Sequence, residues 1–158
     1  ELGTSPEQGS FALTVFFSIG IFMTYIGGLL GDKFGPIKII RLSLLVWLPA
    51  MFLLTEVPNF SPLIMMPVAY LLLLMIGAAK AISYSPVIVL GQTYLAKSIG
   101  FASGITLGVS QTIGGVIAPV VGNLADTYSL PVAMMTLVPF LIGGLGASLL
   151  LKDPKKLQ

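Results

Sequence analysis

Long apolar runs separated by short polar segments dominate the chain. The runs cover about residues 11–30, 37–54, 68–96, 101–124 and 132–151, and most are close to the roughly 20 residues that a helix needs to cross a bilayer. Backbone groups cannot stay unpaired in lipid, so such runs form helices or a closed barrel. Barrel strands would alternate apolar and polar residues, whereas residues 44–54 are solidly apolar. The pattern predicts an all-α, polytopic membrane bundle rather than a soluble domain.

The third apolar region is long enough for one tilted helix or for two shorter ones divided at Lys80. Loop Lys and Arg residues prefer the cytoplasmic side of a membrane. With five spans, seven basic residues fall on one side and none on the other, whereas a break at Lys80 divides them four against four. The charges therefore favour five spans, an outside N-terminus, a cytoplasmic C-terminus and a third helix that tilts or kinks near Pro86.

Composition narrows the possible chemistry. Charged residues make up 9% of the chain and hydrophobic residues 56%, against about 25% charged residues in a soluble domain. The chain contains neither Cys nor His, which excludes disulfides, thiolate nucleophiles, imidazole bases and the usual zinc ligands. The small net charge of +2 argues against a nucleic-acid partner. We therefore predict that the protein is not an enzyme and has neither a cofactor nor a metal site. We also predict that a lipid bilayer surrounds it.

A short polar turn joins the first two runs. It spans residues 28–36 and contains Gly28, Asp32, Lys33 and Gly35. A tight turn needs the backbone freedom of glycine, and both charges are tolerable at the lipid–water boundary. Two interpretations stay open: the charges anchor the turn at the interface, or Asp32 faces the positive N-terminal end of a neighbouring helix.

The fourth run carries a stripe of small residues at steps of three and four positions. The stripe consists of Gly104, Gly108, Gln111, Gly115, Ala118 and Gly122. Small residues let membrane helices approach closely, so packing against another helix of the same chain explains the stripe at least as well as a functional interface does. Gln111 is predicted to face protein rather than lipid, and Pro119 to loosen or bend the helix.

Lys80 is predicted near the middle of the third span. A charge there costs roughly 2.5–3.5 kcal/mol on insertion scales and marks a substrate path by default. Ser83 and Tyr84 follow one turn later on the same face. The alternatives are a lysine that snorkels to the cytoplasmic surface or one that is neutral. All six acidic residues lie in predicted loops or tails, so a counter-ion would come from a substrate or from another polypeptide segment.

Three motifs together resemble the major facilitator superfamily of secondary transporters. Residues 28–35, with Gly28, Asp32, Lys33 and Gly35, are similar to the signature between the second and third helices of a six-helix half. Residues 114–122 are similar to the glycine–proline motif of antiporters in this superfamily. Residues 85–126 resemble the C-terminal half of fosmidomycin-resistance-type efflux transporters, through Gln92, Gly100, Ser103, Gly104, Gly108, Gly122, Ala125 and Asp126.

The resemblance implies that the five spans are helices 8–12 of a twelve-helix transporter whose first seven helices lie outside this chain. Two halves then rock around a central site near the bilayer midplane. The implied activity is proton-coupled efflux of small organic compounds across the cell membrane. The five-helix part alone is predicted not to transport. A small membrane protein that oligomerises through the glycine stripe is the alternative.

The resemblance also assigns roles to particular residues. Asp32 would hold a gate closed against a helix end of the other half. The implied substrate path contains Lys80, Ser83, Tyr84 and Gln92. The implied interface with the N-terminal half contains Gly104, Gly108, Gln111, Gly115, Pro119 and Gly122.

Overall fold

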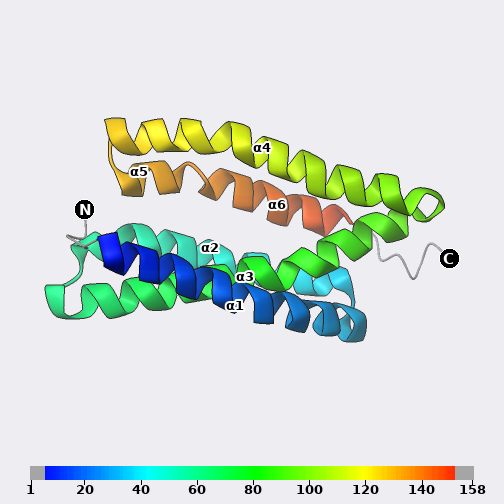
Figure 1. Cartoon of the computed structure of the whole chain (residues 1–158), viewed down its shortest axis with the longest axis horizontal. Coiled ribbons are helices and arrows are strands. Elements are labelled where there is room, and N and C mark those ends of the chain that lie inside the picture. The colour runs from blue at the N-terminus through cyan, green and yellow to red at the C-terminus, as the bar shows by residue number, and fades with distance from the viewer. Residues whose placement is uncertain (1–5, 152–158) are drawn as a thin grey trace.

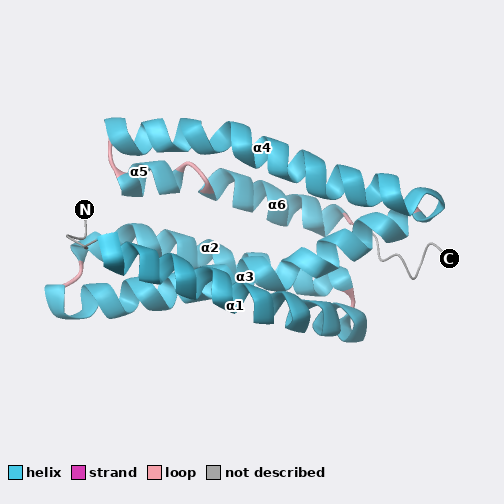
Figure 2. Ribbon diagram, in the orientation of Figure 1, coloured by secondary structure: helices cyan, strands magenta, loops and turns pink. Residues whose placement is uncertain are grey.

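The computed structural model describes residues 6–151, which form helices running side by side along one long axis (Figures 1 and 2). The helices are α1 (Pro6–Phe34), α2 (Pro36–Glu56), α3 (Pro62–Tyr94), α4 (Ile99–Thr127), α5 (Leu130–Met135) and α6 (Val138–Leu150), with 3-10 turns at Val57–Asn59 and Ala96–Ser98. Within residues 6–151, five segments are long and apolar enough to cross a membrane, the last one combining α5 and α6. No strand occurs in this part of the chain. The predicted all-α bundle with one long third helix is confirmed.

The first turn is much shorter than the predicted polar loop. Residues 31–34 form the last turn of α1, and α2 already begins at Pro36. The single linking residue, Gly35, has a φ of +92°, a left-handed conformation that glycine adopts without steric cost. Pro36 suits the first helical position because its φ is fixed and its missing N–H would have no partner there. Lys33, Lys38 and Arg41 consequently lie on helices rather than in a loop.

The last apolar segment is broken, whereas the sequence pattern predicted one continuous span. Residues 136–137 separate α5 from α6 (Figure 2). Pro139 follows the break, and in a continuous helix its ring would clash with the carbonyl four residues earlier. The N–H of Leu137 donates instead to the carbonyl of Met134 at 3.1 Å. The backbone thus remains paired through the break, as a lipid environment requires.

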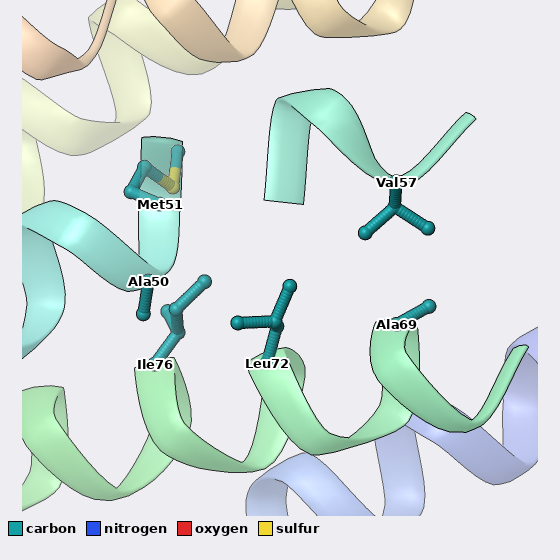
Figure 3. Close-up of a cluster of buried hydrophobic side chains, with 6 residues drawn as sticks. All are labelled: Ala50, Met51, Val57, Ala69, Leu72 and Ile76. Carbon is teal, nitrogen blue, oxygen red and sulfur yellow. The ribbon is translucent and has the colours of Figure 1, made fainter. Parts of the chain in front are cut away.

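α3 is the central helix, and α1 and α2 both pack against it. A buried apolar cluster joins α2, the following turn and α3; it consists of Ala50, Met51, Val57, Ala69, Leu72 and Ile76 (Figure 3). α3 stays a single helix through Pro86, whose fully buried side chain lies against Gly31 of α1. α1 and α3 approach closely at Gly27, where an added Cβ would overlap the backbone carbonyl of Ile82.

α4 is attached to the rest of the bundle only at its ends. It approaches α3 near the turn that joins them and α5 at the other end, and within residues 6–151 none of its Cα atoms lies within 8 Å of a Cα atom of α1, α2 or α6. The start of α1 and the end of α6 lie at opposite ends of the long axis of the bundle (Figure 1). The helix order places Lys33, Lys38, Arg41 and Lys97 at the end where the described chain finishes. Four of the basic residues in the described part of the chain therefore gather at one end of the long axis.

Arg41 joins α2 to the end of α6. Its Nε and Nη2 atoms donate to the carbonyl of Ser148 at 3.1 and 2.7 Å, and Nη2 also reaches the carbonyl of Leu149 at 3.4 Å. The last carbonyls of a helix have no partner within the helix, and a cation is favourable at this negative end. The sequence indicates only the charge of Arg41 and gives no sign of these contacts with α6.

Replacing Arg41 with methionine should destabilise the bundle by about 1.5–3 kcal/mol, because hydrogen bonds to a charged group are worth about that much. Thermal unfolding in nanodiscs, followed by helical circular dichroism, measures the loss. Lys38→Met is the matched control, since Lys38 is an exposed cation on the same helix. Equal losses from both substitutions would show that the contacts with α6 contribute nothing specific.

Candidate functional site

A groove between α1 and α3 surrounds Lys80. Lys80 lies near the middle of α3, which has 33 residues. The groove encloses about 250 Å³, and its lining is mostly apolar or aromatic: Phe16, Phe17, Gly20, Ile21, Thr24, Gly77, Lys80, Ala81 and Tyr84. Both walls thus belong to this chain, and the only charged side chain among the lining residues is Lys80.

The ammonium group of Lys80 lies 5.9 Å from the centroid of the Phe16 ring. The same ring approaches Gly77, where an added Cβ would be 2.9 Å from Phe16 Cδ2. Gly77 precedes Lys80 by almost one turn, so the lysine points back towards the start of α3. This direction leads away from the end of the bundle that holds Lys33, Lys38, Arg41 and Lys97.

The Phe16 ring compensates only part of the cost of placing the Lys80 charge near the middle of a membrane helix. A cation over an aromatic face gains about 0.5–1 kcal/mol at an exposed site, against roughly 2.5–3.5 kcal/mol for a lysine at the centre of a membrane helix. Glu7 on α1 is nine residues before Phe16, about 14 Å along the helix, and Asp32 is about 24 Å beyond Phe16. No described carboxylate of α1 therefore lies at the level of Lys80.

The structure separates the other residues of the predicted substrate path. Tyr84 lines the groove with Lys80. The hydroxyl of Ser83 donates to the carbonyl of Lys80 at 2.9 Å and is not part of the lining. Gln92 lies three turns further along α3, where its amide donates to Ser103 Oγ at 2.8 Å and ties α3 to α4. Lys80 and Tyr84 share one groove, whereas Ser83 and Gln92 serve local and interhelical hydrogen bonds.

The α1 side of the groove was missed by sequence reasoning. Phe16, Phe17 and Thr24 belong to an apolar run with no sharp periodicity, so nothing in the sequence distinguishes the face that meets α3. Thr24 is also internally bonded, its hydroxyl donating to the carbonyl of Gly20 at 2.8 Å. Only the observed pairing of α1 with α3 identifies these side chains as neighbours of Lys80.

The predicted gating motif forms a hollow at the basic end of the bundle. The hollow encloses about 450 Å³ and is lined by residues 31–38, Val89 and Thr93. Asp32 and Lys33 are exposed there, and Lys33 Nζ lies 5.3 Å from the centroid of the Phe34 ring. Gly28 faces α3, since an added Cβ would be 3.2 Å from Ser85 Oγ. No side chain caps the start of α2, so Asp32 does not satisfy that helix end.

The small-residue stripe of α4 is uncovered. Its residues are all exposed, and an added Cβ at Gly104, Gly108, Gly115 or Gly122 meets no atom within 4 Å. Packing against another helix of this chain therefore does not explain the stripe within residues 6–151. Gln111 also faces outward here, so its predicted protein neighbour is absent from this part of the chain. α4 continues through Pro119 as a single helix.

The side of α4 that faces the bundle is a different one. Its partly buried positions include Ser103, Thr106, Ile117 and Val121. Several of these residues directly precede a stripe residue, and one position corresponds to about 100° around a helix. The stripe is thus a second face of α4, distinct from the face that meets α3 and α5.

Comparison with known proteins gives the family. The sequence matches the profile of the Major Facilitator Superfamily over residues 1–158. It is 32% identical over 151 residues to the "Uncharacterized MFS-type transporter YfnC" of Bacillus subtilis (strain 168), covering 96% of this chain and 35% of that protein. The chain thus spans about a third of this relative's length. No solved structure matches the chain. Together with the five apolar helices, the match along its whole length shows that this chain belongs to the major facilitator superfamily, whose members are membrane transporters.

Proposed function

We propose that this chain is the C-terminal, five-helix part of a secondary transporter that exports small organic compounds in exchange for protons. In this assignment α1, α2, α3 and α4 are helices 8–11, and α5 with α6 is helix 12. The observation that carries it is Lys80, a charged side chain at the middle of a long apolar helix, exposed in a groove rather than paired in the core. Intramembrane charges of this kind line substrate pathways.

The uncovered stripe on α4 supports the same assignment. In this superfamily the substrate site lies between two halves near the bilayer midplane, and the halves rock against each other. A face of small residues without a neighbour in this chain suits a helix that contacts the other half. The remaining helices of the transporter would supply that half, and a proton-carrying carboxylate would lie among them.

Two further features support the finer parts of the proposal. Gln92 and Ser103 belong to the segment that resembles fosmidomycin-resistance-type transporters, and their 2.8 Å hydrogen bond joins α3 to α4. The basic residues Lys33, Lys38, Arg41 and Lys97 gather at one end of the bundle. The positive-inside rule supports a cytoplasmic position for that end, and hence an N-terminal end of α1 outside the cell membrane.

A transport assay with protein reconstituted in liposomes tests the proposal. This chain alone and the complete gene product, here termed the full-length transporter, are reconstituted with a pH-sensitive dye inside the vesicles. The outside solution then receives a panel of small organic anions, cations and neutral compounds. We expect compound-driven proton flux from the full-length transporter and none from this chain, because its stripe and groove lack their opposing half. Flux from this chain alone would overturn the division into two required parts.

A further inference from the structure

We infer that the groove around Lys80 binds amphipathic organic anions. The anionic group would meet the Lys80 ammonium, and the apolar body would lie against Phe16, Phe17 and Ile21. This inference rests on the proposed function, because it names the substrate class of the transporter to which the groove belongs. Charge, the unused donors of Lys80 and the size of the groove each support it.

Charge selects the sign of the ligand. Lys80 is the only charged side chain among the residues that line the groove. No described carboxylate of α1 lies at the same level along the helix. Coulomb attraction strengthens as the surroundings become less polar, so an anion gains most at this depth in the bundle. An organic cation would be repelled by the same charge, and a neutral compound would leave it unpaired.

The hydrogen-bonding capacity of Lys80 remains open to a ligand. A lysine ammonium has three N–H donors and no acceptor. The Phe16 ring occupies one side of the ammonium through its π face, and no described residue accepts a hydrogen bond from Nζ. A carboxylate, sulfonate or phosphonate group has several acceptor oxygens and would satisfy these donors with short, charge-assisted bonds.

Size and lining select the rest of the ligand. The groove encloses about 250 Å³, and an engineered cavity of about 150 Å³ already accepts benzene. One or two fused aromatic rings therefore fit. Gly20, Gly77 and Ala81 present little side-chain bulk, while Phe16, Phe17 and Ile21 offer apolar and aromatic surface. The phenol of Tyr84 adds one polar group to the lining for a second substituent.

The test uses three probes with the same naphthalene ring: 2-naphthalenesulfonate, 2-naphthalenemethanol and (2-naphthyl)trimethylammonium. Binding of radiolabelled naphthalenesulfonate to this chain is measured in nanodiscs of zwitterionic lipid, with empty nanodiscs subtracted. We expect saturable binding that unlabelled sulfonate displaces and the neutral and cationic probes do not. Lys80→Met should weaken binding by about tenfold or more, the loss expected when a charged hydrogen-bond donor is removed. Lys80→Arg should retain most of it.

Lys33→Met is the matched control, because Lys33 also lies over an aromatic ring, at 5.3 Å from the Phe34 centroid, but outside the groove. Circular dichroism confirms the helical content of each variant. Displacement of the radiolabelled sulfonate by all three probes alike would overturn the inference. Naphthalenesulfonate binding by Lys80→Met equal to that of the unmodified chain would also overturn it. So would anion binding that this chain shows and the full-length transporter lacks, because a protein carboxylate would then occupy Lys80. These outcomes leave the liposome test of transport itself unaffected.

Discussion

Replacing Gly27 with alanine should force α1 away from α3 and destabilise the bundle by about 1–3 kcal/mol or more, the usual cost of overpacking. Gly27 is buried, and its added Cβ would overlap the backbone carbonyl of Ile82. A backbone atom cannot rotate out of the way as the tip of a side chain can, so the helices themselves must move. The change in thermal unfolding midpoint in nanodiscs measures this cost.

Gly20→Ala is the control for this prediction. Gly20 lies on the same helix, two turns earlier, and an added Cβ there meets no atom within 4 Å. It should leave the unfolding midpoint nearly unchanged. Because α1 and α3 form the two walls of the groove, Gly27→Ala should also weaken naphthalenesulfonate binding. Equal stability of the two alanine variants would contradict the observed close approach of the helices.

Replacing Gly108 with leucine should abolish transport by the full-length transporter while leaving this chain's own stability within about 0.5 kcal/mol, as for surface substitutions. The position is open in this chain, so leucine causes no clash here. Against a second helix it would remove the close backbone approach that small residues permit. Proton flux in liposomes and thermal unfolding in nanodiscs measure the two effects separately.

Val116→Leu is the matched control for this substitution. Val116 is 67% exposed on α4 and lies outside the stripe. A larger side chain there should be tolerated both in this chain and in the full-length transporter. Normal transport by the Gly108→Leu protein would show that the stripe has no tightly packed neighbour.

The helices could be predicted from sequence because membrane spans are defined by length and apolarity alone. The distribution of basic residues even decided that the third apolar region is one helix. The break in the last span could not be predicted in the same way. Pro49, Pro86 and Pro119 lie within continuous helices, whereas Pro139 follows a break. Neighbouring helices decide whether the freed backbone groups are accommodated, and a single sequence does not contain that information.

The site was predictable only where a residue is chemically unusual for its surroundings. Lys80 stands out because it is charged within an apolar run. Phe16 does not stand out, since aromatic residues are ordinary in membrane helices, and it gains meaning only through its position beside Lys80. Glycines show the same limit: Gly20 and Gly27 are alike in sequence, yet only Gly27 meets the backbone of α3.

Cross-linking from the α4 stripe tests the central claim most directly, without knowledge of the substrate. The chain contains no cysteine, so Gly108→Cys can carry a photoactivated benzophenone in the full-length transporter, after removal of any cysteine elsewhere. Mass spectrometry then identifies the peptide joined to position 108 in native membranes. We expect a peptide from a membrane helix of the same polypeptide outside residues 1–158. A peptide from residues 1–158 of a second copy, or labelling of lipid alone, would contradict the assignment of this chain as part of one transporter.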